Sequence, residues 1–397
     1  MSPRSKLLAA CSLFALFVFM TVGVLTTEHQ VTAQAQIRAL ANPDDLVPIY
    51  EVDPHWPKVP LPNNWVIGNV IGVDVDDNDN VWMIHRPAAL TNNEIPLYHN
   101  PPTGVDCCMP APPVLVFNAA GDLVNSFGPL EAGGDFWADA EHGMFIDHTG
   151  AMWTGGGGTG ASNADSALFK FAVDGSLLMT IGRKGVRPYD SNSRDTLGAP
   201  ADIWVEEEDE EIWVADGYGN RRVVVFDYNT GRYKRHWGAY GNAPVDEATT
   251  YDPSAPPSQQ FRPPVHCVLI SNDEFVYICD RGNDRIQVFR KNGEFVFERF
   301  IAKATTSAGS VWDIEFSNDP EQKFVFLVDG INHRVRILRR SDLIQVSEFG
   351  HQGRWAGGFY AAHSIGIDSN SNLYIGETWE GKRVQKFAYK GLGAPTL

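Results

Sequence analysis

Three histidines occupy one position of a sequence repeat, and they are the side chains best suited to chemistry. Each inner strand of the repeat is closed by one of Asp76, Asp147, Glu206, Ser271, Phe316 and Asp368. Counting back five residues from each gives Ile71, His142, Ala201, His266, Val311 and His363. Histidine therefore falls in alternate copies, whereas the other copies carry an apolar residue. Three imidazoles that leave a fourth position open are typical of a catalytic zinc site.

Two further residues could act beside these histidines. Arg86 ends a predicted strand in the first copy of the repeat, and Tyr218 lies in the corresponding loop of the third copy. An arginine can bind a carboxylate at two points or stabilise a phenolate. A tyrosine can serve as a general base. The repeat places both residues on the side where the histidine-bearing strands begin.

The repeat that positions these residues is clearest at residues 261–290, which read as three short strands separated by polar turns. Similar copies occur at 201–226, 311–338 and 363–387, and weaker ones begin at residues 71 and 142. Six antiparallel copies of roughly 40–50 residues predict an all-β, six-bladed β-propeller. We expect a strand near residues 48–52 to close the ring, because the sixth copy has only three strands of its own.

The loops predict which end of the propeller is functional. The turns joining first and second strands are short, whereas second-to-third loops and blade crossings are long, as at 87–113, 183–200 and 239–264. Function is expected on the elaborated face. The inner strands surround the axis, so alternate blades would place the three imidazoles at one level, about 120° apart.

Composition and the N-terminus indicate an exported protein. The 397 residues carry a formal net charge of −17 without any Lys/Arg stripe, which excludes a nucleic-acid ligand. Residues 1–35 resemble a cleaved signal peptide that ends at Ala33-Gln34-Ala35, or else a membrane anchor. We expect a closing segment at 36–66, the propeller at 67–390 and a tail at 391–397. The location would be periplasmic or extracellular, and the oligomeric state is open.

Four cysteines lie beyond the predicted signal, and disulfides are the default in an oxidising compartment. Cys267 and Cys279 flank one predicted hairpin. Cys107 and Cys108 form a vicinal pair in a Pro-rich loop, for which we weigh a disulfide against a thiolate metal site with Met109 and His99.

Residues 65–390 resemble the peptidyl-α-hydroxyglycine α-amidating lyase family, with blades of the NHL type. The matching motifs are GNVIGVDVDDNDNVWMIHR, EHGMFIDHTGAMW, GAPADIWV, VADGYGNRRVVVF, FRPPVHCVLI, DRGNDRIQVF and AAHSIGIDSNSNLYIGE. This family is a six-bladed propeller that cleaves a C-terminal α-hydroxyglycine into a peptide amide and glyoxylate.

The resemblance implies a role for each site residue. It implies a zinc ion held by His142, His266 and His363. It implies catalytic roles for Arg86 and Tyr218, and a further site arginine at Arg281. Zinc would acidify the substrate hydroxyl, Tyr218 would take the proton, and Arg86 would stabilise the phenolate. The substrate would be a small molecule or a peptide C-terminus.

The chain departs from the family pattern near the third histidine. The family's structural calcium uses an Asp where this chain has Ser364, with carbonyl donors that map to Val70 and Met144, so calcium is not expected. Ala361 replaces a family methionine. Two alternatives stay open: another metal-dependent hydrolase or lyase on the same histidines, and a non-enzymatic NHL-type binding propeller.

Overall fold

A computed structural model describes residues 46–131, 133–160 and 163–396 of the chain. Within these ranges the regular structure is β-strand, interrupted by short 3-10 turns. In the described part of the chain, no helix has the length and apolar character needed to cross a bilayer. The predicted signal or anchor at 1–35 lies outside the described residues.

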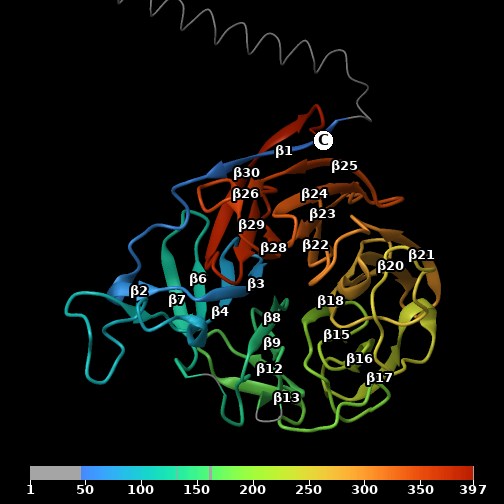
Figure 1. Ribbon diagram of the computed structural model, residues 1–397, viewed down its shortest axis with the longest axis horizontal. Coiled ribbons are helices and arrows are strands. Elements are labelled where there is room, and N and C mark those ends of the chain that lie inside the picture. Colours follow the sequence, from blue (N-terminus) through green and yellow to red (C-terminus); the bar gives the residue numbers. More distant parts are fainter. Residues whose placement is uncertain (1–45, 132, 161–162, 397) are drawn as a thin grey trace, which may run out of the picture. The chain divides into compact units, whose positions relative to one another are not determined.

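Residues 50–390 form a ring of six four-stranded sheets (Figure 1). From inner to outer edge, the first sheet consists of β3 (Asn69–Val75), β4 (Val81–Arg86), β6 (Val114–Phe117) and β7 (Leu123–Phe127). The second consists of β8 (Glu141–Ile146), β9 (Met152–Gly156), β12 (Ala167–Phe171) and β13 (Leu177–Gly182). The third consists of β14 (Asp202–Glu206), β15 (Glu211–Asp216), β16 (Arg222–Asp227) and β17 (Tyr233–Trp237). The fourth and fifth are β18 (Val265–Ile270), β19 (Phe275–Asp280), β20 (Arg285–Arg290) and β21 (Phe295–Phe300); and β22 (Asp313–Phe316), β23 (Phe324–Asp329), β24 (Arg334–Arg339) and β25 (Ile344–Phe349).

The sixth sheet confirms the predicted closure of the ring. Its inner strands are β28 (Ala362–Ile367), β29 (Leu373–Glu377) and β30 (Arg383–Gly393), and its outermost strand is β1 (Val47–Asp53) from the N-terminal side of the chain. Residues 46–49 and 391–396 are assigned to a second compact unit, distinct from the unit at 50–390. The six-bladed propeller predicted from the repeat is therefore confirmed.

A buried aromatic ring in the second strand of every blade explains the repeat. These rings are Trp82, Trp153, Trp213, Tyr277, Phe326 and Tyr374, and each is at most 3% exposed. Large apolar rings of this kind dominate the packing of stacked sheets. In three blades the ring also donates to the aspartate that closes the first turn, as in the 2.9 Å bond from Trp82 Nε1 to Asp76 Oδ2.

The pairing of β22 with β23 corrects one position of the repeat. Phe316 pairs with Val325 as Val75 pairs with Val81, so the fifth blade's equivalent of the histidines is Trp312 and not Val311. The turn that follows β22 is longer than its counterparts, and Ser317 N donates to Phe324 O to close it. Counting from the sequence alone could not reveal this shift.

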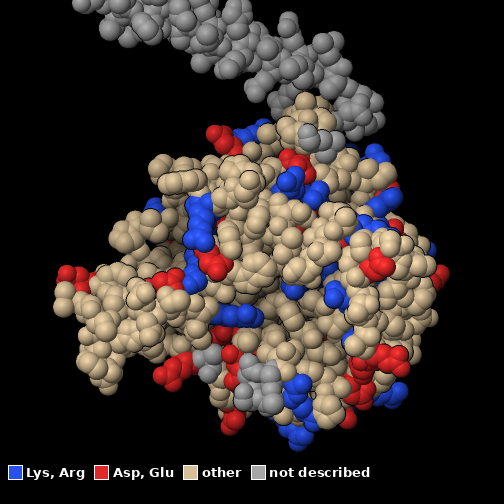
Figure 2. All heavy atoms as spheres, viewed as in Figure 1, with Lys and Arg blue, Asp and Glu red and all other residues tan. Residues whose placement is uncertain are grey.

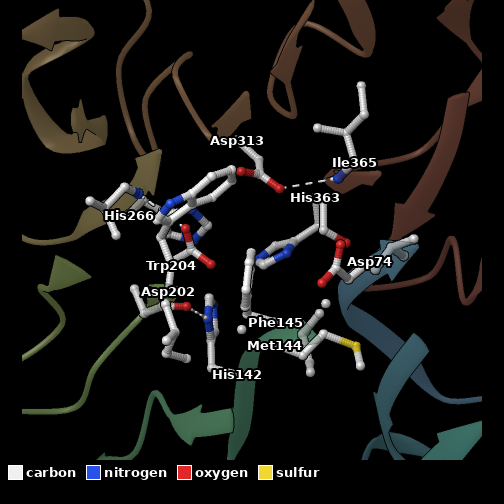
Figure 3. Close-up of a pocket in the computed structure, with 18 of the residues that line it drawn as sticks. Asp74, His142, Met144, Phe145, Asp202, Trp204, His266, Asp313, His363 and Ile365 are labelled. Atoms are coloured by element: carbon white, nitrogen blue, oxygen red, sulfur yellow. Dashed lines mark hydrogen bonds between the residues drawn. The ribbon is translucent and has the colours of Figure 1, made fainter. Parts of the chain in front are cut away.

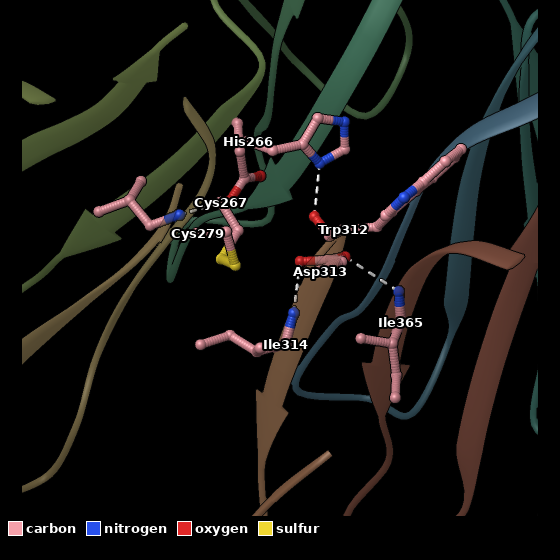
Figure 4. Close-up of a disulfide and its surroundings, with 9 residues drawn as sticks. His266, Cys267, Cys279, Trp312, Asp313, Ile314 and Ile365 are labelled. Carbon is pink, nitrogen blue, oxygen red and sulfur yellow. Dashed lines mark hydrogen bonds between the residues drawn. A yellow bond between two sulfur atoms is a disulfide. The ribbon is translucent and has the colours of Figure 1, made fainter. Parts of the chain in front are cut away.

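Both cysteine pairs are disulfides, Cys107–Cys108 and Cys267–Cys279. The first lies in the insertion between β4 and β6. His99, the ligand considered for a thiolate site, instead places Nε2 3.1 Å from Asn92 O. The second links β18 to β19 beside His266 (Figure 4). The structure thus favours the disulfide interpretation over the thiolate site.

Candidate metal centre

His142, His266 and His363 converge on the axis of the propeller from β8, β18 and β28 (Figure 3). Their ring centroids are 4.9–5.0 Å apart, and one nitrogen of each ring lies within 4.8 Å of the others. All three side chains are buried, with 2–4% of their surface exposed. The three histidines that share one repeat position in the sequence therefore form one cluster in space.

A register shift at each histidine turns its side chain toward the axis. The ladders of β8, β18 and β28 shift by one residue at these positions, and β3 shifts at Ile71, whereas β14 and β22 pair without a break. A bulge of this kind re-aims a side chain. Gly143, beside His142, has a φ of +58°, and a Cβ there would lie 2.3 Å from Ala201 O. Only glycine suits that position without displacing the neighbouring blade.

The outward nitrogen of each ring faces a main-chain carbonyl of the next blade. His142 Nδ1 donates to Ala201 O at 2.7 Å, and His266 Nδ1 donates to Trp312 O. Ile71 O lies in the corresponding place beside His363, although His363 Nδ1 has no partner within ordinary hydrogen-bond distance. A carbonyl acceptor fixes the tautomer with hydrogen on Nδ1, so Nε2 keeps a free lone pair.

Burial lowers the pKa of all three histidines well below the ordinary value, and nearby arginine charges lower it further. Arg86 is the next largest influence on His142, and Arg281 on His266. The imidazoles are consequently neutral at physiological pH, which is the form that binds a metal. Neutral rings, a fixed tautomer and convergent nitrogens together fit a divalent ion such as zinc.

Tyr218 lies over two of these histidines from the loop between β15 and β16. Its hydroxyl is 2.9 Å from His142 Nε2 and 3.2 Å from His266 Nε2. The loop is held by backbone bonds, including one of 3.1 Å from Tyr218 N to Ala199 O. The phenol predicted from the sequence is therefore in direct contact with the proposed ligands.

The two predicted arginines occupy different places around this phenol. Arg281 NH1 donates to Tyr218 Oη at 3.2 Å, so Arg281 rather than Arg86 contacts the phenol oxygen. Arg86 Nε donates to Glu141 O at 2.8 Å, and its NH2 lies near Gly157, His142 and the Tyr218 ring. Neither guanidinium forms an ion pair with a carboxylate of the described residues. Both are therefore available to an anionic ligand.

Figure 2 shows this face hollowed near its centre, with basic side chains at the edge of the hollow. Sequence reasoning missed Trp312, whose ring lies 5.4 Å from His363 and 4.6 Å from the Arg281 guanidinium. It also missed four carboxyl groups that line the channel beside the histidines, namely Asp74, Asp202, Asp313 and Glu315. These four residues can be identified only from the structure, where the strand register turns them toward the channel.

Burial raises the pKa of these channel carboxyl groups, to about 7 for Asp74 and about 8 for Glu315. The side chains retain some accessible surface, but it faces the channel and not bulk solvent. Main-chain N–H groups oppose the effect of burial, as where Ile146 N donates to Asp74 at 2.6 Å. No lysine or arginine is among the residues that line this channel.

We expect the Asp74→Asn substitution to flatten the pH dependence of stability. In the folded protein Asp74 holds its proton up to a pH of about 7, whereas in the unfolded chain it loses the proton near 3.9. Its stabilising contribution is thus complete below about pH 4 and is lost as the pH rises to 7, by at most about 1.4 kcal/mol per pH unit. Urea unfolding at pH 5 and pH 8 measures this.

In that experiment the free energy of unfolding should fall more steeply with pH for wild type than for Asp74→Asn. The exposed Asp195→Asn variant, from the loop between β13 and β14, should behave as wild type. Equal slopes for wild type and Asp74→Asn would contradict the assignment.

Sequence comparison finds the predicted resemblance. Peptidyl-glycine alpha-amidating monooxygenase B of Xenopus laevis is 26% identical over 249 residues, or 62% of this chain and 25% of that protein. A probable peptidyl-alpha-hydroxyglycine alpha-amidating lyase of Caenorhabditis elegans is 27% identical over 229 residues, or 56% of each chain. Human NHL repeat-containing protein 3 is 25% identical over 62% of this chain and 59% of its own. No family model matches the chain.

Among solved structures, a streptogramin B lyase is 12% identical with a TM-score of 0.51, over 86% of this chain and 98% of its own. This likeness concerns the fold alone. The chain spans about a quarter of the length of the amphibian relative and just over half that of the nematode one. The chain is therefore a six-bladed NHL-type propeller that is similar in sequence to amidating enzymes, and it carries a buried three-histidine cluster able to bind a metal.

Proposed function

We propose that the protein is an exported, zinc-dependent lyase that acts on an N-acyl α-hydroxyglycine and releases an amide and glyoxylate. The observation that carries this proposal is the contact of Tyr218 Oη with two histidines of the cluster and with Arg281. This arrangement places a proton acceptor, a cation and metal-binding nitrogens around one small space. The substrate would be a small molecule or the C-terminus of a peptide.

His142, His266 and His363 would hold the metal. When bound there, a divalent ion would supply Lewis acidity to an oxygen of the substrate. The carbonyls of Ala201 and Trp312 keep the rings in place for that purpose.

Tyr218 would move the proton. Arg281 NH1 stabilises the phenolate form of Tyr218, and this phenolate oxygen takes the proton of the substrate's α-hydroxyl group. The C–O bond then becomes a carbonyl and the C–N bond breaks. The proton passes to the departing amide nitrogen, so the products are the amide and glyoxylate, and atoms and charge balance without an oxidant or water.

The two arginines would hold the substrate's carboxylate. Both lack an ion-pair partner among the described residues, and both lie beside the histidines and Tyr218. A guanidinium binds a carboxylate at two points and so fixes its orientation. The α-carbon, which carries the hydroxyl, would then lie between the arginines and Tyr218.

The relatives' names support this reaction, because two of them are amidating enzymes.

Two disulfides support export, since such bonds persist in oxidising compartments. Cell fractionation of the full chain tests the export; recovery in the cytosol alone would contradict it. A binding propeller stays the competing interpretation, because the name of human NHL repeat-containing protein 3 gives a repeat and no activity.

The activity is tested by incubating metal-loaded protein with α-hydroxyhippurate, which is N-benzoyl-α-hydroxyglycine, and measuring glyoxylate against a protein-free control. We expect release well above the spontaneous rate, and we expect loss of that release after chelation and its return with zinc. Zinc-loaded protein that does not exceed the control on any N-acyl α-hydroxyglycine would reject the proposed substrate class.

A further inference from the structure

An exposed tryptophan stands next to the site on its open face. Trp379 lies in the loop between β29 and β30, the same kind of loop that carries Tyr218 and Arg281, and it is 42% exposed. Its ring meets the edge of Trp312 with centroids 5.4 Å apart at 82°. Its large apolar ring is therefore partly open to solvent and packs on one side against a residue that contacts the histidine cluster.

Trp312 connects Trp379 to the proposed centre. The Trp312 ring is fully buried and lies against His266, His363 and the guanidinium of Arg281. Its Nε1 donates to Gly309 O at 2.7 Å, and a Cβ on Gly330 would lie 2.5 Å from the ring. The ring therefore cannot turn, and it offers its neighbour a fixed surface.

The loop holds Trp379 in a conformation that a bulky residue rarely adopts. Its φ is +51°, in the left-handed region. Thr378 N donates to Ala361 O, and Glu377 pairs with Arg383 at 2.6 Å on the same loop. Lys382 pairs with Glu94 of the long insertion at 2.7 Å. Backbone strain that is maintained by surrounding contacts is concentrated at functional sites.

We propose that Trp379, supported by Trp312, binds the acyl group of the substrate and gives the site a preference for aromatic or large apolar acyl groups. This inference rests on the proposed function. With the carboxylate at the arginines and the scissile bond at Tyr218, the acyl group extends toward the open face. Trp379 lies on that face and contacts Trp312, which in turn contacts Arg281. An acyl ring would therefore cover the exposed surface of Trp379.

The preference can be measured by calorimetric titration with N-benzoylglycine and N-acetylglycine, which lack the hydroxyl group and cannot react. Metal-loaded wild type should bind the benzoyl compound more tightly. Trp379→Ala should weaken benzoyl binding by roughly tenfold, the upper range for an aromatic pair, and leave acetyl binding unchanged. Trp379→Phe should keep most of the preference, and the 84% exposed Trp355→Ala should match wild type.

The inference is overturned if wild type shows no preference, or if Trp379→Ala keeps it or weakens both ligands equally. Melting temperatures and metal content of each variant show whether the fold and the centre are intact. Turnover of N-benzoyl and N-acetyl α-hydroxyglycine separates the two proposals. If wild type is inactive but the binding preference depends on Trp379, the reaction is wrong and the acyl surface stands. If wild type is active and Trp379→Ala keeps the wild-type ratio of the KM values for the two substrates, the reaction stands and the acyl surface is wrong.

Discussion

Tyr218→Phe should reduce turnover of α-hydroxyhippurate by roughly 10²–10⁴-fold, the range typical of a lost general base. The phenol oxygen is within 3.2 Å of two cluster histidines and of the Arg281 guanidinium, so it is the acceptor best placed for the substrate's proton. Phenylalanine retains the ring and its packing on His142, whose centroid lies 4.8 Å away. Steady-state kinetics should show the loss in kcat, with metal content unchanged.

Matched variants separate this role from a general loss of packing. Tyr233→Phe removes a phenol from the outer strand of the third blade, where its hydroxyl bonds only to His236 among the described contacts, and it should retain full activity. Arg86→Lys and Arg281→Lys should both lower activity, because an ammonium cannot reproduce a planar two-point contact. If Tyr218→Phe stays within a few-fold of an active wild type, the phenol is not the base.

His266→Ala should abolish tight metal binding and, with it, activity. Removal of one ligand leaves only two convergent imidazoles, which do not complete a catalytic zinc site. The blades should keep their fold because their cores consist of strand residues such as Trp213 and Phe289. Elemental analysis after dialysis should find about one zinc ion in wild type and far less in the variant.

The control for this prediction is His351→Ala, at an exposed histidine between the fifth and sixth blades. That variant should keep its metal, and both variants should keep a β-rich circular dichroism spectrum. Full metal occupancy in a folded His266→Ala protein would remove the cluster from consideration as the metal site.

The repeat was sufficient to predict the six blades, the closing strand and the convergence of three histidines. It could do so because the buried second-strand aromatics and the turn-closing aspartates recur at fixed spacing. It failed at Trp312, because Phe316 was taken as the residue that closes β22, whereas strand pairing gives that position to Ser317. The longer turn after β22 hides this end of the strand in the sequence, and only the pairing of β22 with β23 reveals it.

Other features of the site had no sequence signal. The channel carboxyl groups do not share one repeat position: Asp202 and Asp313 are equivalent by strand pairing, whereas Asp74 and Glu315 lie two residues farther along their strands. Which arginine contacts Tyr218 depends on the paths of two loops, and the structure gives that contact to Arg281. The exposure and the positive φ of Trp379 follow from the path of its loop, which no repeat position determines.

Product analysis of the α-hydroxyhippurate reaction tests the proposed lyase most directly. Cleavage of the bond between the nitrogen and the α-carbon leaves benzamide and glyoxylate in equal amounts. Hydrolysis of the acyl bond on the same metal centre would instead leave benzoate, with glyoxylate and ammonia from breakdown of the other fragment. We predict benzamide and glyoxylate in a 1:1 ratio, formed faster than without protein and dependent on Tyr218. Benzoate as the protein-dependent product would contradict the account.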